Sequence, residues 1–516
     1  MSELGFWKGA AAEPAKLALV TPDEQEISRG ELLAQSNRLT HGLHALGLEK
    51  GDAIAVVVPN GQPSIELYLA AFQSGWYLTP INNHLAGPEI AYIVNDCEAK
   101  AFIVEERFAE TCQLAAKEIS VPDQARFAIG NVAGFRPYAD LKEGQSRQLP
   151  DDRSAGAVMN YTSGTTGRPK GVRRPLAPLD PDTVGALFTG FLGLFGVKPD
   201  DGNVHLVGSP LYHTAVLMFA SGSMHMGHPI VVMDKWRPED FLRLIGKYRV
   251  TTSHMVPTQF HRMLQLPEEV RSRYDVSSTR TMVHAAAPCP IETKQRMLDW
   301  WGDSIFEYYA ATEGGGTLVP PEEWKQYPGT VGRAWVNAEI AIFDDDGNEC
   351  PTGTPGTVYM LRGQADFEYY KDKDKTEKAR LGRYFTVGDI GYLNEEGYLF
   401  LCDRKADMII SGGVNIYPAE IESALLTHPK VADAAVFGIP HEDWGEEVKA
   451  VIQPVDGAEP GGALTGEILA FCAERLAKYK TPRSIDYTED MPRDPNGKLY
   501  KRKLRDPYWE GRERAI

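Results

Sequence analysis

The stretch Tyr161-Thr-Ser-Gly-Thr-Thr-Gly-Arg-Pro-Lys-Gly171 decides how this chain is interpreted, because it is short, rich in glycine and hydroxyl groups, and carries one lysine. The apolar residues Ala155–Asn160 before it predict a buried strand. A loop that leaves a strand with free N–H groups, hydroxyls and a lysine suits a polyphosphate. It is not a Walker A loop, since its lysine precedes a glycine and only two residues separate its first two glycines. Taken alone, the stretch is equally compatible with a flexible surface turn.

Six further motifs follow in order, and together with the first they span nearly the whole chain. They are Val256-Pro257-Thr258, Ala285-Ala-Ala-Pro288, Tyr309-Ala-Ala-Thr-Glu313, Gly388-Asp389 with Asp403-Arg404, Ser411-Gly-Gly-Val-Asn-Ile-Tyr-Pro-Ala-Glu-Ile-Glu422 and Pro492-Arg-Asp-Pro-Asn-Gly-Lys498. This ordered set resembles the adenylate-forming superfamily of acyl-CoA synthetases, luciferases and peptide-synthetase adenylation domains. The resemblance implies an α/β fold. It predicts a large N-terminal domain of layered α/β subdomains with a β-barrel-like region, followed by a small mobile α+β C-terminal domain.

The composition is that of a globular protein with an acidic surface. Of the 516 residues, 43% are hydrophobic and 24% are charged, and the formal net charge is −17. Nucleic-acid binding is therefore not expected, and any anionic ligand must be held by local lysines and backbone amides. The six scattered cysteines predict neither a disulfide framework nor a zinc site. They fit a reducing cytosol, so a cytoplasmic protein is expected.

No segment predicts an integral membrane protein. The N-terminal residues lack the charged and apolar pattern of a secretion signal. The longest weakly polar run, Gly185–Val197, is too short to span a bilayer, and we expect it to pack inside the protein. Peripheral membrane contact is the alternative if the substrate is a lipid. A homodimer is compatible with the sequence.

Strand-like runs alternate with helix-like segments, which predicts α/β layers with largely parallel sheets. Asp52–Pro59 predicts a strand and Pro63–Ser74 an amphipathic helix. The other predicted strands are Lys100–Glu105, Val204–Ser209, Pro229–Met233 and Thr281–Ala286, and the other predicted helices are Pro238–Tyr248 and Ile291–Trp301.

A change of pattern near residue 403 predicts the domain organisation. A turn-rich β region precedes this point, and roughly a hundred residues with their own helices and strands follow it, enough for a small domain. We predict a large adenylation domain at 1–403, a hinge at 404–407 and a small domain at 408–516. In the family the small domain rotates just after the arginine that corresponds to Arg404. The usual hinge residue, Asp or Lys, is replaced here by Ala406.

Activation of a carboxylic acid by ATP brings two anions together, so catalysis depends mainly on charge neutralisation and alignment. The resemblance implies that Lys498 bridges the attacking carboxylate and the α-phosphate, and that Thr312 contacts the α-phosphate. Glu313 would hold Mg²⁺, and the two carboxylate oxygens of Asp389 suit the ribose diol. The implied ATP and AMP contacts are Thr162, Ser163, Gly164, Thr165, Thr166, Gly167, Lys170, Ala286, Glu307, Tyr308, Tyr309, Thr312, Asp389, Arg404 and Lys498.

Some positions depart from the family pattern. Glu307 and Tyr308 replace the Gln-Gly or Asn-x pair that is common beside adenine, and Ala285 and Ala310 each replace a usual glycine. Apart from its motif, Lys498 is compatible with a solvated surface charge.

The acceptor predicted from the sequence is free CoA. Ser411, Gly412 and Gly413 are small enough for a pantetheine arm to pass close to the backbone. Lys235 resembles a lysine that meets a CoA phosphate in the family, although a surface lysine before a helix is the alternative. No carrier-protein domain follows Lys498 in this sequence.

The predicted acid is hydrophobic. Amino-acid-activating relatives place a Phe-Asp pair where this chain has Tyr212-His213, and the missing aspartate argues against an amino acid. His213 resembles the histidine that flanks the acyl carboxylate in CoA ligases, so it joins Lys498 in the predicted catalytic set. An apolar run that includes Met218 follows it. The acyl pocket is predicted from Tyr212, His213, Met218, Gly314, Gly315 and Gly316, and a fatty, aryl or steroid-side-chain acid is expected.

The leading hypothesis is an AMP-forming acyl-CoA ligase that uses ATP, Mg²⁺, CoA and a small carboxylic acid. Three alternatives stay open: an adenylating enzyme with another acceptor, a luciferase-like oxygenase, and a nucleotide-binding relative without turnover. The altered adenine wall and Ala406 motivate the last of these.

Overall fold

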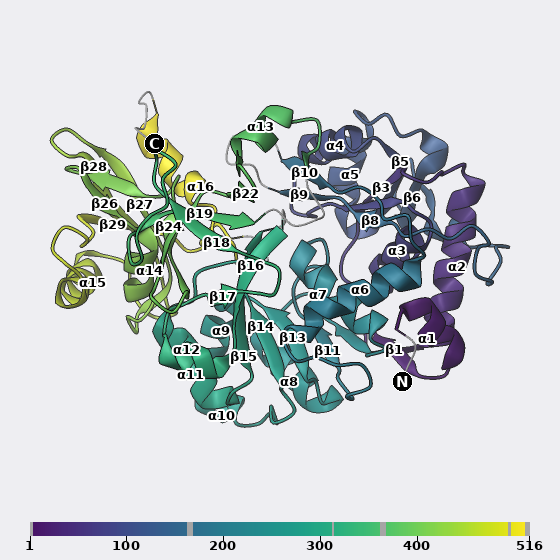
Figure 1. Ribbon diagram of the computed structural model, residues 1–516, viewed down its shortest axis with the longest axis horizontal. Coiled ribbons are helices and arrows are strands. Elements are labelled where there is room, and N and C mark those ends of the chain that lie inside the picture. The colour runs from purple at the N-terminus through teal and green to yellow at the C-terminus, as the bar shows by residue number, and fades with distance from the viewer. Residues whose placement is uncertain (1–3, 163–168, 312–313, 362–367, 494–496, 511–516) are drawn as a thin grey trace. The chain divides into compact units, whose positions relative to one another are not determined.

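The computed structural model describes residues 4–162, 169–311, 314–361, 368–493 and 497–510 (Figure 1). Contacts between residues divide the chain into two compact units. Unit 1 comprises residues 1–254, 268–282 and 364–378, and unit 2 comprises residues 255–267, 283–363 and 379–516. The chain passes between the units at 254/255, 267/268, 282/283, 363/364 and 378/379, and the third of these points lies within strand β14 (Thr281–His284).

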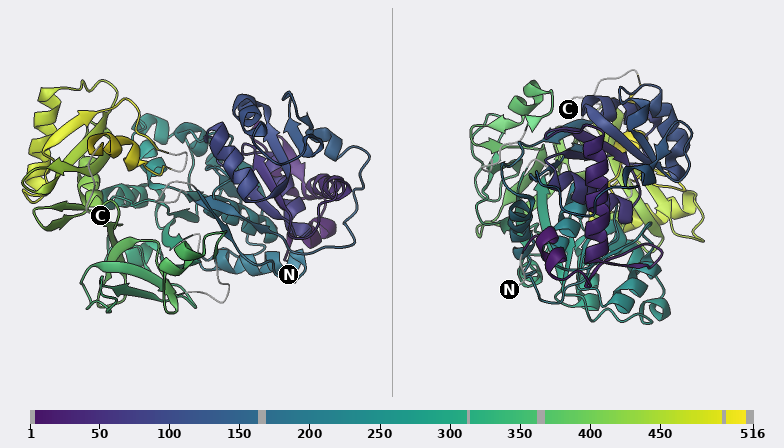
Figure 2. Two further views of the ribbon diagram at one scale, coloured as in Figure 1. Left: turned by 90° about the horizontal axis from the view of Figure 1, so that it is seen from above. Right: turned by 90° about the vertical axis from the view of Figure 1, so that its right-hand side faces the viewer.

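Unit 1 contains a six-stranded, entirely parallel sheet of order β7-β6-β5-β3-β4-β8. Its central strand β3 is buried at all five positions, as expected for an apolar run covered on both faces. The long helix α2 packs against α3 and is drawn in purple in Figure 2. The strands are β3 (Ala53–Val57), β4 (Tyr77–Pro80), β5 (Ala99–Glu105), β6 (Arg126–Ile129), β7 (Arg136–Pro137) and β8 (Ala157–Val158), and the helices are α2 (Arg29–Ala45), α3 (Gln62–Gln73), α4 (Gly87–Asp96) and α5 (Ala109–Ala116).

A second set of strands in unit 1 has the order β13-β11-β12-β1-β2, and only β2 runs antiparallel to its neighbour. The core that these layers enclose includes Trp7 and Trp76, both fully buried. The strands are β1 (Leu17–Val20), β2 (Glu26–Ser28), β11 (His205–Val207), β12 (Ile230–Val232) and β13 (Thr252–Met255), and the helices are α1 (Phe6–Ala12), α6 (Pro181–Gly193), α7 (Thr214–His225), α8 (Pro238–Tyr248) and α10 (Glu268–Arg271).

The glycine-rich stretch belongs to a third, small sheet of order β20-β10-β9. Strand β10 (Lys170–Arg173) runs antiparallel to both β9 (Asn160–Thr162) and β20 (Glu368–Tyr369). Helix α13 (Lys373–Lys378) follows β20. Two segments almost 200 residues apart in the sequence therefore pair directly beside the predicted phosphate loop.

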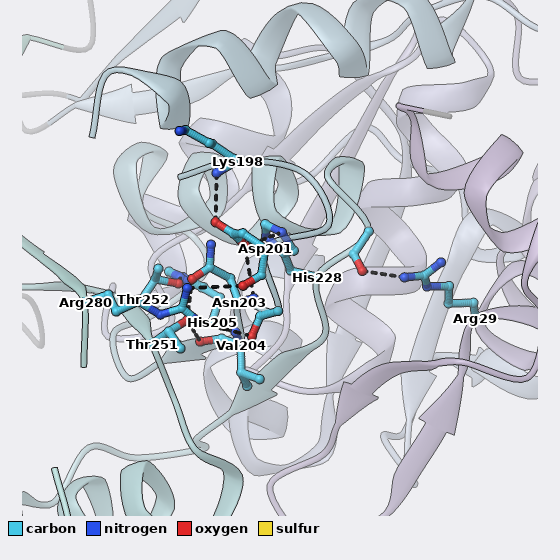
Figure 3. Close-up of polar contacts among 12 residues, drawn as sticks. Arg29, Lys198, Asp201, Asn203, Val204, His205, His228, Thr251, Thr252 and Arg280 are labelled. Atoms are coloured by element: carbon cyan, nitrogen blue, oxygen red, sulfur yellow. Dashed lines mark hydrogen bonds and ion pairs between the residues drawn. The ribbon is translucent and has the colours of Figure 1, made fainter. Parts of the chain in front are cut away.

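A polar network joins the amino-terminal ends of β11 and β13 (Figure 3). The Asp201 side chain accepts the backbone N–H groups of Lys198 and Asn203, at 3.0 and 3.1 Å. The His205 Nδ1 atom lies 3.0 Å from the Thr252 hydroxyl. Burial lowers the pKa of His205 to about 3, so this imidazole is neutral near pH 7. The network satisfies backbone groups where the strands begin, and this role is structural.

The apolar run Gly185–Val197 packs inside the protein on one face only. It forms most of α6, whose N-cap Asp180 accepts the N–H of Thr183 at 3.1 Å. Leu192 is buried, whereas Leu187 is 66% and Phe188 40% exposed. The expectation that the whole run packs inside was therefore wrong, because a helix at the surface turns part of any continuous apolar segment to solvent. Among the described residues, no helix is long and apolar enough to cross a membrane.

Unit 2 combines three antiparallel β layers. One has the order β17-β16-β15; the second has the order β21-β22-β19-β23-β24, with β18 paired to β19. The strands are β15 (Ile305–Ala311), β16 (Gly314–Val319), β17 (Arg333–Ala334), β18 (Ile340–Phe343), β19 (Gly356–Leu361), β21 (Arg380–Leu381), β22 (Tyr384–Phe385), β23 (Asp389–Leu393) and β24 (Leu399–Arg404), and the helices are α9 (Pro257–Leu264), α11 (Ile291–Trp301) and α12 (Pro321–Gln326).

The third layer of unit 2 is the sheet β26-β25-β28-β27, in which β29 pairs parallel to β28. Helices α14 and α15 share its apolar core, which includes Ile421, Ile468 and Cys472. The elements are β25 (Ile409–Ser411), β26 (Val414–Ile416), α14 (Pro418–Leu425), β27 (Val431–His441), β28 (Gly445–Pro454), α15 (Gly462–Arg475), β29 (Ser484–Tyr487) and α16 (Lys501–Arg505). The C-terminal residues thus contain both helices and a mostly antiparallel sheet, as the α+β prediction requires.

Candidate functional site

Three of the predicted nucleotide residues meet in unit 2. The Tyr309 hydroxyl donates to Asp389 Oδ2 at 2.6 Å, and Arg404 Nε lies 3.4 Å from Asp389 Oδ1. Strand pairing explains the meeting, because Asp389 begins β23 and its partner across the ladder is Arg404, which ends β24. The Asp389 side chain is 12% exposed, whereas that of Arg404 is 46% exposed. The site therefore offers a fixed carboxylate beside an aromatic ring and a partly solvated cation.

Glu307 and Tyr308, predicted to border adenine, lie in a buried environment. Lys294 Nζ binds Glu307 Oε2 at 2.6 Å, and His284 Nε2 lies 3.4 Å from the same oxygen. Desolvation raises the pKa of Glu307 and lowers that of Lys294, and their attraction opposes both shifts. Burial also raises the pKa of Tyr308. The Glu307 carboxylate anchors β15, the strand that carries Tyr309.

Ala286, the third predicted residue of the adenine wall, has an unusual backbone conformation. It is exposed and has a φ of 74°, in the left-handed region that a side chain with a Cβ disfavours. It follows β14, whose last residue His284 approaches Glu307. The turn is therefore held at His284 by a buried contact, and its backbone is strained at Ala286.

The loop of the predicted catalytic Lys498 is closed by long-range bonds. Arg493 binds Asp433 with two bonds, Nε to Oδ2 at 2.6 Å and Nη2 to Oδ1 at 2.7 Å. A third bond runs from Arg493 Nη1 to the Gly497 carbonyl at 2.5 Å, and Arg493 also pairs as a β-bridge with Leu499. A Cβ atom on Gly497 would lie 2.6 Å from the Thr258 hydroxyl oxygen, so this loop passes close to the Val256-Pro257-Thr258 motif.

Several predicted residues lie outside the described part of the chain. These are Ser163, Gly164, Thr165, Thr166, Gly167, Thr312 and Glu313. Thr162 ends β9, and its backbone is paired with Lys170 of β10. Among the described residues, no group of three His, Cys, Asp or Glu side chains is arranged to hold a metal ion.

Lys170 of the glycine-rich stretch lies at the start of β10 in unit 1. Its Nζ atom is 3.1 Å from Asp372 Oδ2, and this contact raises the pKa of the lysine. Its ammonium group therefore remains charged at physiological pH, as a phosphate ligand must be.

The predicted acyl residues of unit 1 surround the start of α7. His213 is the N-cap residue of this helix, and its ring lies 4.4 Å from that of Tyr212. Asn160 Nδ2 donates to the Tyr212 carbonyl at 3.0 Å, which ties the start of β9, just before the glycine-rich stretch, to this turn. A narrow apolar cavity is bordered by Leu211, Tyr212 and Leu217, whereas Met218 is half-buried.

The glycines Gly314, Gly315 and Gly316 lie on β16 in unit 2. Gly315 has a φ of 68°, and a Cβ there would lie 2.9 Å from the Met360 Cβ. The backbone and its packing therefore already require glycine at this position, whether or not the space serves an acyl group.

The predicted pantetheine loop is a tight β-hairpin. Gly412 and Gly413 connect β25 to β26 with φ values of 57° and 80°, as a two-residue type I′ turn requires. The Gly412 N–H donates to the Trp444 carbonyl at 2.9 Å. The Trp444 ring stacks on His441 at 4.2 Å, and the Arg483 guanidinium lies over it at 3.8 Å. Lys235 is exposed after β12.

The comparisons with known proteins identify the family. The AMP-binding enzyme model matches residues 6–370, and the AMP-binding enzyme C-terminal domain matches residues 420–498. The chain therefore belongs to the AMP-binding enzyme family. The resemblance to the adenylate-forming superfamily is thus confirmed, as is the prediction of an enzyme of its AMP-forming ligase class.

Similar proteins cover almost the full length of the chain. A fatty acid–[acyl-carrier-protein] ligase, ScoC of Streptomyces coeruleorubidus, is 30% identical over 98% of this chain and 96% of that protein. The long-chain-fatty-acid–CoA ligase FadD13 of Mycobacterium tuberculosis is 31% identical over 97% of each chain. The solved o-succinylbenzoate CoA synthetase of Bacillus subtilis, in complex with its acyl-adenylate, has a TM-score of 0.80, 27% identity, and coverage of 97% and 98%. The predicted α/β fold, with a large N-terminal and a small C-terminal domain, is confirmed.

Four side chains that the sequence reasoning missed stand out at these sites. Lys294 and Asp433 each complete an ion pair with a residue far away in sequence, and only the fold brings these partners together. Trp444 carried a local signal, since a tryptophan in the polar segment His441-Glu-Asp-Trp-Gly445 is unusual unless its ring binds something. Asp372 lies in a highly charged segment that gives no comparable signal.

Proposed function

We propose that the chain activates a hydrophobic carboxylic acid with ATP, forming acyl-AMP and pyrophosphate, and then transfers the acyl group to CoA with release of AMP. The arrangement of Tyr309, Asp389 and Arg404 carries this proposal. Asp389 would accept the two ribose hydroxyls, and the Tyr309 ring would cover the adenine. Because the Asp389 carboxylate is already oriented by two partners, little ordering remains to be done when the nucleotide binds.

Lys498 is the proposed catalytic cation. Its ammonium would neutralise the attacking carboxylate and the α-phosphate, where charge repulsion opposes the reaction. The bonds of Arg493 to Asp433 and Gly497 support this role, since they hold both ends of the loop that carries Lys498. Thr312 would contact the α-phosphate, and Lys170 the β- and γ-phosphates.

Mg²⁺ is proposed only as the counter-ion of ATP. It would reach the site on the polyphosphate, whose oxygens are hard ligands, and Glu313 would supply a carboxylate ligand.

The proposed acyl pocket lies at the turn from Tyr212 to His213. The apolar residues of α7 that follow His213, which include Leu217 and Met218, support a hydrophobic acid. We propose a fatty, aryl or steroid-side-chain acid; relatives named for long-chain fatty and feruloyl substrates support the first two of these classes. His213 would orient the acid carboxylate beside the turn.

CoA is the proposed acceptor. The hairpin turn at Gly412 and Gly413 leaves a backbone without side chains, past which a pantetheine arm can run. The Trp444 ring beside it contacts the His441 imidazole and the Arg483 guanidinium and is partly exposed, and we propose that its exposed part contacts the adenine of CoA. Lys235 is proposed as a CoA phosphate ligand. An acyl-carrier protein is the second candidate acceptor, because ScoC is named for that activity.

We also propose that residues 404–407 act as a hinge between a large domain at 1–403 and a small domain at 408–516. Asp403 Oδ2 accepts the N–H of Ala419 at 2.8 Å, and the Ala406 carbonyl accepts Arg505 Nη1 at 3.4 Å. Because position 406 is alanine, we propose that these bonds from residues outside the hinge, and not a side chain at position 406, hold its conformation.

The test is to incubate the protein with ATP, Mg²⁺, CoA and a panel of fatty, aryl and steroid acids, and to measure AMP and acyl-CoA together. We expect both products with one class of acid. AMP without acyl-CoA would refute CoA as the acceptor, and acyl transfer to an added carrier protein would then favour the second candidate. Absence of AMP with every acid, in a protein that binds ATP, would favour the relative without turnover.

The Lys498→Ala variant tests the division of labour between the two half-reactions. We expect a loss of about a hundredfold or more in acyl-AMP formation, while transfer of preformed acyl-AMP to CoA survives. Lys503→Ala, at an exposed lysine of α16, is the matched control and should change neither half-reaction. An equal loss in both half-reactions would contradict the assignment.

A further inference from the structure

Lys170 is paired with a carboxylate from a distant segment. Its Nζ atom lies 3.1 Å from Asp372 Oδ2, and both side chains are about one quarter exposed, at 27% and 24%. Lys170 is the first residue of β10, and Asp372 directly precedes α13. The resting partner of the proposed phosphate-binding lysine is therefore an acidic group of the protein itself.

The position of Asp372 is fixed by its backbone. Its N–H donates to the Tyr369 carbonyl at 2.9 Å, and its carbonyl accepts both the N–H and the hydroxyl of Thr376, at 3.1 and 2.9 Å. Asp372 thus sits at the start of α13, where its backbone has little freedom to move away. The Tyr370 N–H donates to the Gly171 carbonyl at 2.8 Å, which joins the segment to β10.

Side chains around Asp372 hold the same two segments together. The Arg173 guanidinium lies 4.4 Å from the ring centre of Tyr77 and 4.8 Å from that of Tyr370. Lys371 Nζ donates to the Asp96 carbonyl at 3.0 Å and to Glu98 Oε1 at 3.1 Å. Because the two residues before Asp372 are held in this way and its own backbone is bonded, the fold keeps the Asp372 carboxylate beside Lys170.

We propose that Asp372 is a counter-ion that competes with the β- and γ-phosphates for Lys170, and so weakens the binding of ATP and of pyrophosphate. The inference rests on the proposed function, in which Lys170 binds these phosphates. When a polyphosphate takes the ammonium, the ion pair of Asp372 with Lys170 is broken and the carboxylate faces a second anion, which opposes binding through like-charge repulsion. AMP lacks the β- and γ-phosphates, so Asp372 does not affect its affinity. Asp372 is thus an affinity-setting residue for the triphosphate and not a catalytic one.

The size of the effect follows from the partial exposure of the pair. Ion pairs at such positions contribute modestly because water and salt screen them, so we expect Asp372→Asn to tighten ATP and pyrophosphate about three- to tenfold. The substitution keeps the shape of the side chain and its capacity to cap α13. Added salt should reduce the difference between the variant and the wild type.

The experiment is calorimetric titration of the wild type and of Asp372→Asn with ATP, pyrophosphate and AMP at fixed Mg²⁺. The inference requires tighter ATP and pyrophosphate binding with unchanged AMP binding. Asp374→Asn is the matched control, since Asp374 is exposed in the first turn of α13 and should alter no affinity. In a Lys170→Met background, Asp372→Asn should no longer tighten the polyphosphates. If Asp372→Asn does not fold, Asp372→Ser, which also caps a helix, replaces it.

Each outcome distinguishes the two proposals. If the wild type binds ATP and Asp372→Asn binds it equally or more weakly, the inference fails and the proposed function stands. Equal tightening of AMP would also overturn the inference, because it would place the effect outside the β- and γ-phosphates. If the wild type binds neither ATP nor AMP, the result refutes both the proposed function and the inference.

Discussion

Substitution of Lys294 by methionine should destabilise unit 2 strongly. The lysine is fully buried, its Nζ lies 2.6 Å from Glu307 Oε2, and the ammonium also lies 4.7 Å from the ring centre of Trp324. Methionine has a similar length but no charge, so Glu307 is left as a buried carboxylate without its cation. Removing one partner of such a pair costs about 3–5 kcal/mol.

The pH dependence of this loss follows from the pKa of Glu307. Desolvation already raises that pKa above 4.5, and Lys294 is the influence that lowers it, so the variant should raise it further. A carboxyl group whose pKa is higher in the folded state stabilises the fold most at pH below its unfolded pKa. It loses that contribution as the pH rises through the folded value. The destabilisation by Lys294→Met should therefore be largest at pH 8 and clearly smaller near pH 5.

Urea unfolding at pH 8 and pH 5, followed by circular dichroism, measures the loss, and hydrogen exchange of Ile305–Ala311 shows whether β15 opens locally. The double variant Lys294→Met with Glu307→Leu is the control. It replaces the pair with apolar groups and should recover at least half of the lost free energy. A loss below about 1 kcal/mol at pH 8, or one that does not change with pH, would refute the reasoning.

Three further predictions concern the proposed sites. Tyr309→Phe removes the hydroxyl that donates to Asp389. The loss of about 1–3 kcal/mol of binding free energy should raise the KM for ATP about 5- to 100-fold. Initial rates at varied ATP measure this KM, and an unchanged value would contradict the prediction. Trp444→Ala should raise the KM for CoA about tenfold and spare acyl-AMP formation, whereas Tyr479→Ala, at an aromatic residue that is 52% exposed, should change neither. Ala286→Gly relieves the left-handed backbone at 74° and should raise the free energy of unfolding by about 0.5–1 kcal/mol, whereas Ala287→Gly should lower it; urea midpoints of the two variants decide.

The helices and strands that were predicted from local patterns in the sequence are present in the structure. The helix predicted at Pro63–Ser74 is α3 at Gln62–Gln73, and the strand predicted at Lys100–Glu105 is β5 at Ala99–Glu105. These elements follow from apolar periodicity and from proline or glycine at their ends, which act over a few residues. The contact between Asp389 and Arg404 was not predicted, although it has a local basis, because a short turn folds β23 back onto β24.

Long-range pairs were not predictable from the same patterns. Lys294 lies on α11, a helix of mixed polarity, so its sequence does not indicate that its side chain is buried. The burial depends on β15, which places Glu307 against it. Asp372 reaches Lys170 only because β20 pairs with β10 across almost 200 residues. A single sequence contains no signal for such contacts, since they depend on how sheets and helices pack and not on neighbouring residues.

The register of one β-ribbon gives a reason for the proposed hinge. Strands β27 and β28 form a continuous antiparallel ribbon, with Asp433 opposite Gln453 near one end and His441 opposite Gly445 at the other. The loop of Lys498 is bonded to Asp433, whereas Trp444 and the Gly412 hairpin lie at the His441 end. Eight residues of extended chain separate the two anchor points, or about 26 Å at ~3.3 Å per residue. One acyl carbonyl cannot meet both ends at once. If Lys498 forms acyl-AMP and the Trp444 end admits CoA, as proposed, the two ends of this ribbon would serve the reaction in turn, and the proposed hinge at 404–407 would allow that change.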